Sequence, residues 1–105
     1  MNYKDNKSRR VYGIDVDGTL TFPTDGYALT KPNIDMIKAV RDLYFQGHII
    51  IIWTARCWDD APELISFLEK NSIPYHGIKM GKGGCDIYVD DKMMSIPDFI
   101  KPKEE

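Results

Sequence analysis

Cysteine and long apolar runs are both scarce in this sequence. The 105 residues include two cysteines, Cys57 and Cys85, which are too few for a disulfide framework and do not form a C-x-x-C pair. The longest apolar run, Ile49 to Trp53, is far shorter than the roughly 20 residues that cross a bilayer. The chain begins with polar and charged residues, so no signal-peptide core is expected there. We therefore expect a cytoplasmic protein with free thiols and no membrane contact.

Neither sign of charge is in large excess. The formal net charge is −2 and the hydrophobic fraction is 43%, a composition that is ordinary for a globular protein and too apolar for a disordered chain. Lys7, Arg9 and Arg10 are the nearest approach to a basic cluster, and a solvated terminus accounts for them, so no nucleic-acid patch is expected. Because domains commonly span roughly 100–150 residues, we predict a single domain over residues 1–105 with its core at 10–99.

Apolar patterns predict strands that alternate with helices. Strands are expected at residues 10–15, 48–53, 76–80 and 86–90. The second of these is a continuous apolar run, which is typical of a strand buried on both faces of a parallel sheet. Right-handed crossovers place helices over the faces of such a sheet, so the order predicts an α/β fold with a mainly parallel sheet.

Two amphipathic helices are expected between these strands. The first begins at Asn33 and stops at Gly47, and the second runs from Asp60 to Asn71, where Asp60 and Glu63 suit a capping box. Helical spacing predicts the buried faces, which are Ile34, Ile37, Val40, Leu43 and Tyr44 in the first helix and Leu64, Ile65, Phe67 and Leu68 in the second.

Side chains capable of chemistry follow three of the predicted strands. They are Asp15 and Asp17 after the first strand, Thr54 and Arg56 after the second, and Asp90 and Asp91 after the last. Ligands of open α/β sheets bind at the carboxyl ends of the strands, so these groups are expected to converge there. Four carboxylates in one cleft repel each other, and a hard cation such as Mg²⁺ is the expected compensation.

Two simpler interpretations of the first acidic turn fit less well. An EF-hand calcium loop also begins D-x-D, but here its third acidic position is Thr19, its required glycine is Leu20 and its closing Glu is Gly26. A single Asp-Gly pair is often only a turn or a helix cap. The joint pattern at three strand ends favours a functional site.

The segment Ile14-Asp-Val-Asp-Gly-Thr-Leu20 resembles the first signature motif of the haloacid dehalogenase (HAD) superfamily, in which D-x-D-G-T-L follows a hydrophobic strand. Ile50-Ile-Ile-Trp-Thr54 resembles the second motif, and Asp86-Ile-Tyr-Val-Asp-Asp91 resembles the fourth. The resemblance covers residues 10–99. Within the superfamily, Thr54-Ala-Arg56 and the run from Ile73 to Lys92 look most like small capless phosphatases of capsule or polysaccharide biosynthesis.

This resemblance implies a Rossmann-like three-layer sandwich with a HAD-like core, no cap domain, and Mg²⁺-dependent hydrolysis of phosphomonoesters. Asp15 would be the nucleophile that forms an aspartyl phosphate, and Asp17 would be the general acid and base. The metal would be held by Asp15, by the main-chain carbonyl of Asp17 and by Asp90, with Asp91 orienting its hydration shell. An aspartate at position 17, where ATPase-type members carry threonine, favours a phosphatase.

The same resemblance implies which groups contact phosphate. The main-chain N–H groups around Gly18, the hydroxyl of Thr54 and the ammonium of Lys82 would hold phosphoryl oxygens. Lys82 lies in Gly81-Lys-Gly-Gly84, where relatives often have G-K-P. This departure leaves Lys79 as a competitor for the role.

Substrate specificity is less well determined by the sequence. Residues 22–31 have room only for a loop or short flap, so the site should be open. An open site suits a large phosphorylated molecule, a sugar phosphate, or coverage by a neighbouring subunit of a homo-oligomer, and the residues leave these alternatives open. Arg56 fits either a surface salt bridge or a substrate contact. Tyr27, Trp53 and Trp58 fit core or rim packing better than the lining of a cleft.

Two other functional classes are alternatives to an enzyme. A phospho-accepting switch of the receiver type also combines acids, Mg²⁺, Thr and Lys on a parallel sheet. Its accepting aspartate follows a middle strand, however, and no acid ends residues 48–53 here. A catalytically inactive binding module with the same fold is disfavoured by the intact set of Asp15, Asp17, Thr54 and Asp90.

Overall fold

Strands and helices alternate along the chain. The structure, a computed structural model, describes residues 9–23, 28–81, 87 and 93–100. Its elements in chain order are β1 (Val11–Ile14), α1 (Ile34–Phe45), β2 (Ile49–Trp53), a 3-10 turn η2 (Trp58–Asp60), α2 (Ala61–Lys70), β3 (Gly77–Lys79) and α3 (Ile96–Ile100). Of the strand predicted at residues 86–90 only Ile87 is described, and it lies in a bend and is 79% exposed.

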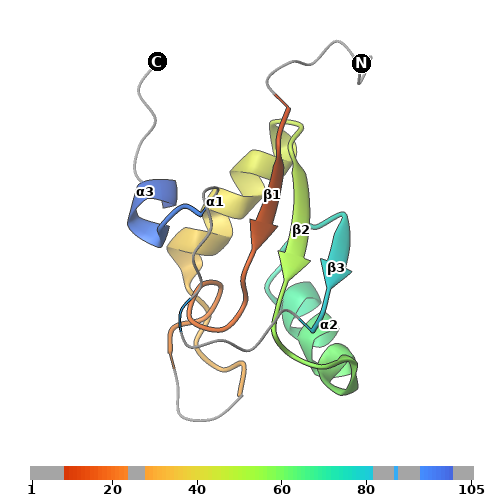
Figure 1. The fold of residues 1–105 in the computed structure, drawn as a ribbon. Helices are drawn as coiled ribbons and strands as arrows, with labels where there is room; N and C mark the ends of the chain where they lie inside the picture. Colours follow the sequence, from red (N-terminus) through yellow and green to blue (C-terminus); the bar gives the residue numbers. More distant parts are fainter. Residues whose placement is uncertain (1–8, 24–27, 82–86, 88–92, 101–105) are drawn as a thin grey trace.

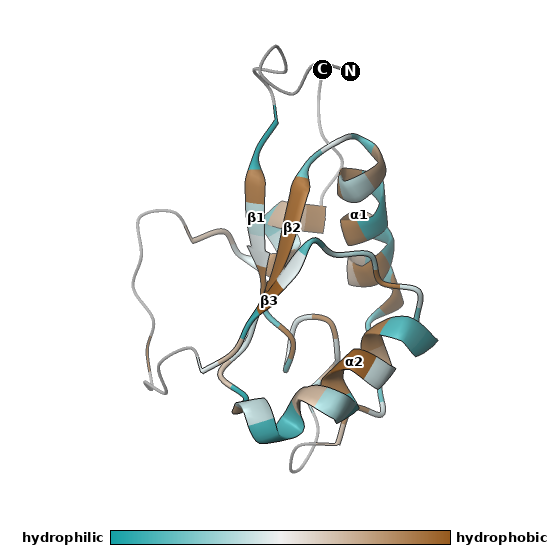
Figure 2. Ribbon diagram, turned by 90° about the vertical axis from the view of Figure 1, so that its right-hand side faces the viewer, coloured by the Kyte–Doolittle hydropathy of each residue, from teal (hydrophilic) through white to brown (hydrophobic). Residues whose placement is uncertain are grey.

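The strands form a parallel sheet in the order β1-β2-β3 (Figure 1). Ile14 is level with Ile52 on the neighbouring strand, and Ile52 is level with Ile78 on the next. Because each crossover moves one strand further in the same direction, both connecting helices belong on one face of the sheet, and Figure 2 shows α1 and α2 there. The predicted α/β fold with a Rossmann-like parallel sheet is thus confirmed at this level.

The two faces of β2 differ in burial. Ile50 and Ile52 are 0% exposed and join the core beneath the helices, whereas the alternate residues of the strand are half-buried. The prediction of a strand buried on both faces is therefore met on one face only within the described residues. Trp53 lies on the less buried face, where its ring contacts β1 so closely that a Cβ at Gly13 would be 3.3 Å from it. This is the rim packing that the sequence predicted for Trp53.

Helix α1 begins where the sequence predicted. The side chain of Asn33 accepts a hydrogen bond from the Met36 N–H and caps the helix, and Gln46 ends it just before Gly47. Ile34 was predicted to be buried but is 55% exposed, and Met36 is buried instead. Ile34 is the first residue of the helix and lies outside its buried face. The short helix α3 packs against α1, with Phe99 reaching the core.

Helix α2 differs from its prediction at its start. Asp60 is its N-terminal flanking residue, but its side chain makes no capping hydrogen bond, so the expected capping box is wrong. The turn η2 leads directly into the helix and leaves Asp60 at φ −90° and ψ 4°, away from the extended conformation that a capping side chain needs. Ile65, predicted as core, is 37% exposed, whereas Leu64 and Leu68 are 0% exposed. Among the described helices none has the length and apolarity to cross a membrane.

Candidate active site

The first acidic loop is a tight turn organised by one carbonyl group. The main-chain oxygen of Val16, two residues after the end of β1, accepts hydrogen bonds from the N–H groups of Thr19, Leu20 and Thr21 at 3.1, 2.9 and 3.2 Å. Gly18 adopts φ +82°, a left-handed conformation that favours glycine. This turn holds Asp15 and Asp17 at the carboxyl edge of the sheet.

Two threonine hydroxyls complete this turn. Thr19 Oγ1 donates to Asp15 Oδ2 at 3.3 Å, and Thr21 Oγ1 accepts from the Gly18 N–H at 3.3 Å. Thr21 is buried and also forms an isolated antiparallel bridge with Pro32, which closes the base of the predicted flap. Neither Thr19 nor Thr21 was predicted to be a site residue. The signal that could have found them is a pair of hydroxyl residues flanking Leu20 directly after the acidic turn.

The second loop begins at Thr54, directly after β2. Thr54 is 1% exposed, its N–H donates to the Lys79 carbonyl at 3.0 Å, and its Oγ1 accepts from the Arg56 N–H at 3.1 Å. The Arg56 carbonyl accepts in turn from the Gly81 N–H at 2.9 Å. The main chain of Arg56 is therefore held on both sides, between its own loop and the chain that follows β3.

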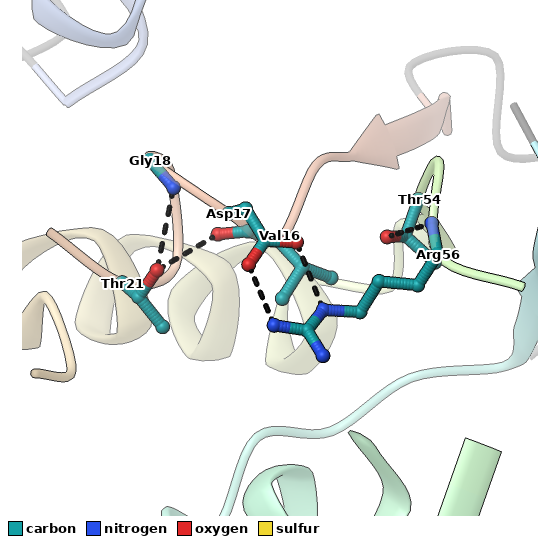
Figure 3. A network of polar contacts seen from close by, with 6 residues as sticks. All are labelled: Val16, Asp17, Gly18, Thr21, Thr54 and Arg56. Carbon is teal, nitrogen blue, oxygen red and sulfur yellow. Dashed lines mark hydrogen bonds and ion pairs between the residues drawn. The ribbon is translucent and has the colours of Figure 1, made fainter. Parts of the chain in front are cut away.

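Arg56 and Asp17 join the two loops through a bidentate ion pair (Figure 3). Arg56 Nε donates to Asp17 Oδ2 at 2.9 Å, and Nη2 donates to Oδ1 at 2.8 Å. The arginine side chain is only 1% exposed, whereas that of Asp17 is 44% exposed. The surface salt bridge that was one sequence interpretation of Arg56 is thus a pair with a buried arginine. A contact between Arg56 and substrate stays a prediction.

The electrostatic setting of Arg56 keeps it charged. The pKa of its guanidinium is raised, chiefly by the hydrogen bonds to Asp17, while burial acts in the opposite direction and the charges of Asp17, Glu63 and Asp60 add to the increase. A raised pKa on a base means that the pair's contribution to stability is complete below the ordinary pKa of arginine. Arg56 therefore carries its charge throughout the neutral pH range.

The structure gathers five of the predicted site residues at one edge of the sheet. Asp15, Asp17 and Gly18 come from the loop after β1, and Thr54 and Arg56 come from the loop after β2. The predicted residues Lys82, Asp90 and Asp91 lie outside the described residues. Lys79, the competitor of Lys82, is exposed, and its Nζ lies 5.5 Å from the centroid of the Trp53 ring.

The donor atoms on the first loop suit a hard cation. The carboxylate of Asp15 and the main-chain carbonyl of Asp17 supply oxygen, which Mg²⁺ prefers. The carboxylate of Asp17 is held by Arg56, in keeping with the expectation that this residue would bind metal through its carbonyl. Over residues 9–23, 28–81, 87 and 93–100, no three His, Cys, Asp or Glu side chains are grouped as a metal site. Asp90 and Asp91, the other expected ligands, are not among those residues.

Two other residues of the second loop are exposed. Cys57 is a free, exposed thiol, and Trp58 is 66% exposed. Tyr27, the third aromatic residue considered for a cleft, lies outside the described residues. Neither Cys57 nor Trp58 contributes a hydrogen bond to the ion pair that joins the loops.

Comparison with known proteins supports the fold. A crystal structure of an MCSG target from Vibrio cholerae is similar, with a TM-score of 0.78 and 26% sequence identity, over 90% of this chain and 89% of that chain. No family model matches this chain, and no curated protein does. The chain is therefore an α/β protein with a Rossmann-like parallel sheet and a polar site at the carboxyl edge.

Proposed function

We propose that this protein is a Mg²⁺-dependent phosphomonoester hydrolase of the haloacid dehalogenase type. The observation that carries the proposal is the arrangement of two aspartates in one tight turn after β1, the second of them paired with an arginine from the turn after β2. This turn contains the D-x-D-G-T-L sequence on which the resemblance to the superfamily rests. The carboxyl edge of a parallel sheet is also where ligands of such folds bind.

In the first half of the reaction, Asp15 acts as the nucleophile. One of its carboxylate oxygens forms a bond to phosphorus while the bond between phosphorus and the ester oxygen breaks. The leaving oxygen takes a proton and departs as an alcohol, and the enzyme is left as an aspartyl phosphate. The hydrogen bond from Thr19 to Asp15 Oδ2 restrains the orientation of the attacking carboxylate.

In the second half, a water molecule attacks phosphorus and gives a proton to Asp17, while the bond between phosphorus and the Asp15 oxygen breaks, which releases inorganic phosphate and restores the Asp15 carboxylate. The two hydrogen bonds from Arg56 hold the carboxyl group of Asp17 in one orientation for this proton transfer. To protonate the leaving alcohol in the first half, Asp17 must carry a proton at that stage. Transfer of the water proton to Asp17 in each cycle supplies it for the next one.

Phosphate and metal are held by groups of this chain on either side of Asp15. The Thr54 hydroxyl is the proposed phosphate donor among the described residues, with Lys82 as the expected cationic partner. The N–H groups of Gly18 and Thr19, which the resemblance assigns to phosphate, donate to Thr21 Oγ1 and the Val16 carbonyl in this structure. Asp15, the Asp17 carbonyl and Asp90 are the proposed metal ligands. Bound Mg²⁺ supplies charge that offsets the repulsion between the carboxylates and a phosphate dianion.

The substrate is proposed to be a phosphorylated small molecule or polymer end that enters an open site. The segment between Thr21 and Pro32 is short, and its two ends are joined by the bridge between these residues. Such a segment is a flap at most, in line with the expectation of a capless enzyme.

The test is a phosphatase screen over sugar phosphates, nucleotides and phosphorylated polymer ends. We expect release of inorganic phosphate with Mg²⁺, reversible loss of the activity in EDTA, and inhibition by Ca²⁺, whose larger coordination number lets a carboxylate bind through both oxygens. Asp15→Asn is the matched negative control. Full activity in chelator would contradict the metal assignment, and a stable phosphoprotein without turnover would favour a phospho-accepting switch.

A further inference from the structure

The environment of Arg56 differs from both environments that the sequence suggested for it, a surface salt bridge and a substrate contact. From the contacts of its side chain we infer that Arg56 is a positioning residue that acts through Asp17, rather than a ligand of the substrate phosphate. The inference rests on the proposed function, because it concerns how the general acid and base of that reaction is held. It is carried by the bidentate geometry, by the burial of Arg56 and by the hydrogen bonds of its main chain.

The burial of the two partners differs in a way that sets their roles. The guanidinium is part of a side chain that is 1% exposed, whereas Asp17 is 44% exposed. A group that meets substrate must be reachable from solvent, and of these two side chains Asp17 is the reachable one. Arg56 therefore lies behind Asp17, with Nε and Nη2 both directed at its carboxylate.

The bidentate contact fixes the plane of the Asp17 carboxylate. Two parallel N–H···O bonds, at 2.9 and 2.8 Å, restrain rotation about the bond to the carboxyl group. A lysine presents a single point charge and does not impose this restraint. The main chain of Arg56 is fixed as well, because its N–H donates to Thr54 Oγ1 and its carbonyl accepts from the Gly81 N–H.

The ion pair also changes the charge that an anionic substrate meets. Arg56 cancels the charge of Asp17, so the first loop presents the charge of Asp15 alone to a phosphate dianion. At the same time it connects the turn that carries the nucleophile to the loop that carries Thr54. One buried arginine thus aligns the proton-transfer group with a proposed phosphate donor.

The experiment is a double-mutant cycle read on two substrates. Arg56→Lys, Arg56→Met and Asp17→Asn are combined, and each protein is assayed on 4-nitrophenyl phosphate, whose leaving group needs little protonation, and on glycerol phosphate, whose alkoxide needs it. We expect the Arg56 variants to lose about tenfold or more in kcat on glycerol phosphate, with a much smaller loss on the aryl ester. In the Asp17→Asn background, replacing Arg56 should add little further loss.

Arg41→Met is the matched control. Arg41 also holds a loop, through hydrogen bonds to the carbonyls of Ser72 at 2.9 Å and Asn71 at 2.6 Å, but this loop precedes β3 at the opposite edge of the sheet. Its loss should lower stability without changing the ratio of the two activities. Equal losses on both substrates in the Arg56 variants, as for a general structural defect, would overturn the positioning role.

The remaining outcomes separate the inference from the proposed function. Weaker inhibition by inorganic phosphate, a higher KM for both esters and additive losses in the cycle would make Arg56 a phosphate ligand and overturn the inference alone. If the wild-type protein hydrolyses neither ester and no compound of the wider screen, the proposed function and the inference are both contradicted. If both Arg56 variants unfold, hydrogen exchange of the Arg56 Nε–H, measured by NMR, takes the place of the kinetics. We expect slow exchange of this proton in the wild type and fast exchange in Asp17→Asn. Equal exchange rates in the two proteins would contradict the pairing of Arg56 with Asp17.

Discussion

The two edges of the sheet use polar side chains in different ways. At the amino edge, His76 precedes β3 and its Nδ1 accepts from the Ile50 N–H at 3.0 Å, while its own N–H donates to the Ile50 carbonyl at 2.8 Å. His48 precedes β2, and its Nδ1 accepts from the Arg10 N–H at 3.1 Å. Both histidines thus extend the hydrogen bonding of the strands, and their rings contact Tyr44 and Tyr12.

At the carboxyl edge the polar side chains bond to each other. Asp17 and Arg56 pair across two loops, and Thr19 donates to Asp15. A side chain that completes the backbone hydrogen bonding of a strand is explained by structure alone. An exposed carboxylate that is oriented by a buried arginine is a costly arrangement for stability, because the arginine is desolvated. From this difference we propose that the carboxyl edge is the functional one.

The largest effect is expected from Asp15→Asn at the carboxyl edge. An amide is a poor nucleophile and a poor metal ligand, so turnover should fall by about a thousandfold or more, while the near-isosteric change leaves the fold intact. Steady-state kinetics with Mg²⁺, with circular dichroism as the control for folding, makes the measurement. A folded variant that retains near-normal turnover would remove Asp15 from the role of nucleophile.

The two lysines should differ next most strongly. Lys82→Ala should lose about 2–4 kcal/mol of transition-state stabilisation, as for the loss of one charge-stabilising group. Lys79→Ala should leave kcat/KM nearly unchanged, because Lys79 is exposed and lies over the Trp53 ring. Steady-state kinetics of both variants determine which of the two lysines belongs to the site. The reverse pattern would assign the phosphate-binding role to Lys79.

A change at the amino edge should alter stability and leave the chemistry intact. His76→Leu removes the acceptor of the Ile50 N–H, which belongs to a fully buried residue, and the stacking of His76 on Tyr44. We expect a loss of about 1–2 kcal/mol in the free energy of unfolding, measured by urea denaturation, with kcat unchanged for the folded protein. His48→Leu is the companion variant. A large fall in kcat at constant stability would break the distinction between the edges.

An effect on stability no larger than that of His76→Leu is expected from Gly18→Ala in the first turn. A Cβ at this position would meet no atom within 4 Å, so the cost is the left-handed conformation itself at φ +82°. That cost is about 1–2 kcal/mol, measured as a shift of the unfolding midpoint. Ala61→Gly, at the start of α2, provides a comparison in which the glycine is introduced instead. Unchanged stability in Gly18→Ala would show that the turn tolerates another conformation.

Local patterns predicted much of the fold because they act within a few residues. The apolar run before Thr54, the start of α1 at Asn33 and the end of α2 at Asn71 all follow from neighbouring residues, and the structure confirms them. The exposure of Ile34 and Ile65 was not predictable from spacing, because a helical stripe does not reveal where its edges meet the sheet. The capping box failed because η2 changes the backbone conformation at Asp60.

The sequence predicted that Asp15, Asp17, Gly18, Thr54 and Arg56 lie at one edge of the sheet, and it predicted none of the contacts between them. Sequence motifs identified Asp17 and Arg56 separately, but 39 positions separate them, and their pairing depends on the parallel register of β1 and β2. No local pattern encodes that contact. The roles of Lys82, Asp90 and Asp91 stay predictions that rest on the resemblance.

The most direct test of a nucleophilic Asp15 is chemical trapping of the phosphoenzyme. Wild-type protein and Asp17→Asn are mixed with Mg²⁺ and a phosphomonoester substrate, quenched in acid and treated with borohydride, which reduces an aspartyl phosphate to homoserine. Mass spectrometry of the peptide that contains residue 15 should then reveal homoserine at that position, in larger amount in Asp17→Asn and none without substrate. Hydrolysis of the ester by a protein whose Asp15 remains unmodified under these conditions would contradict the account.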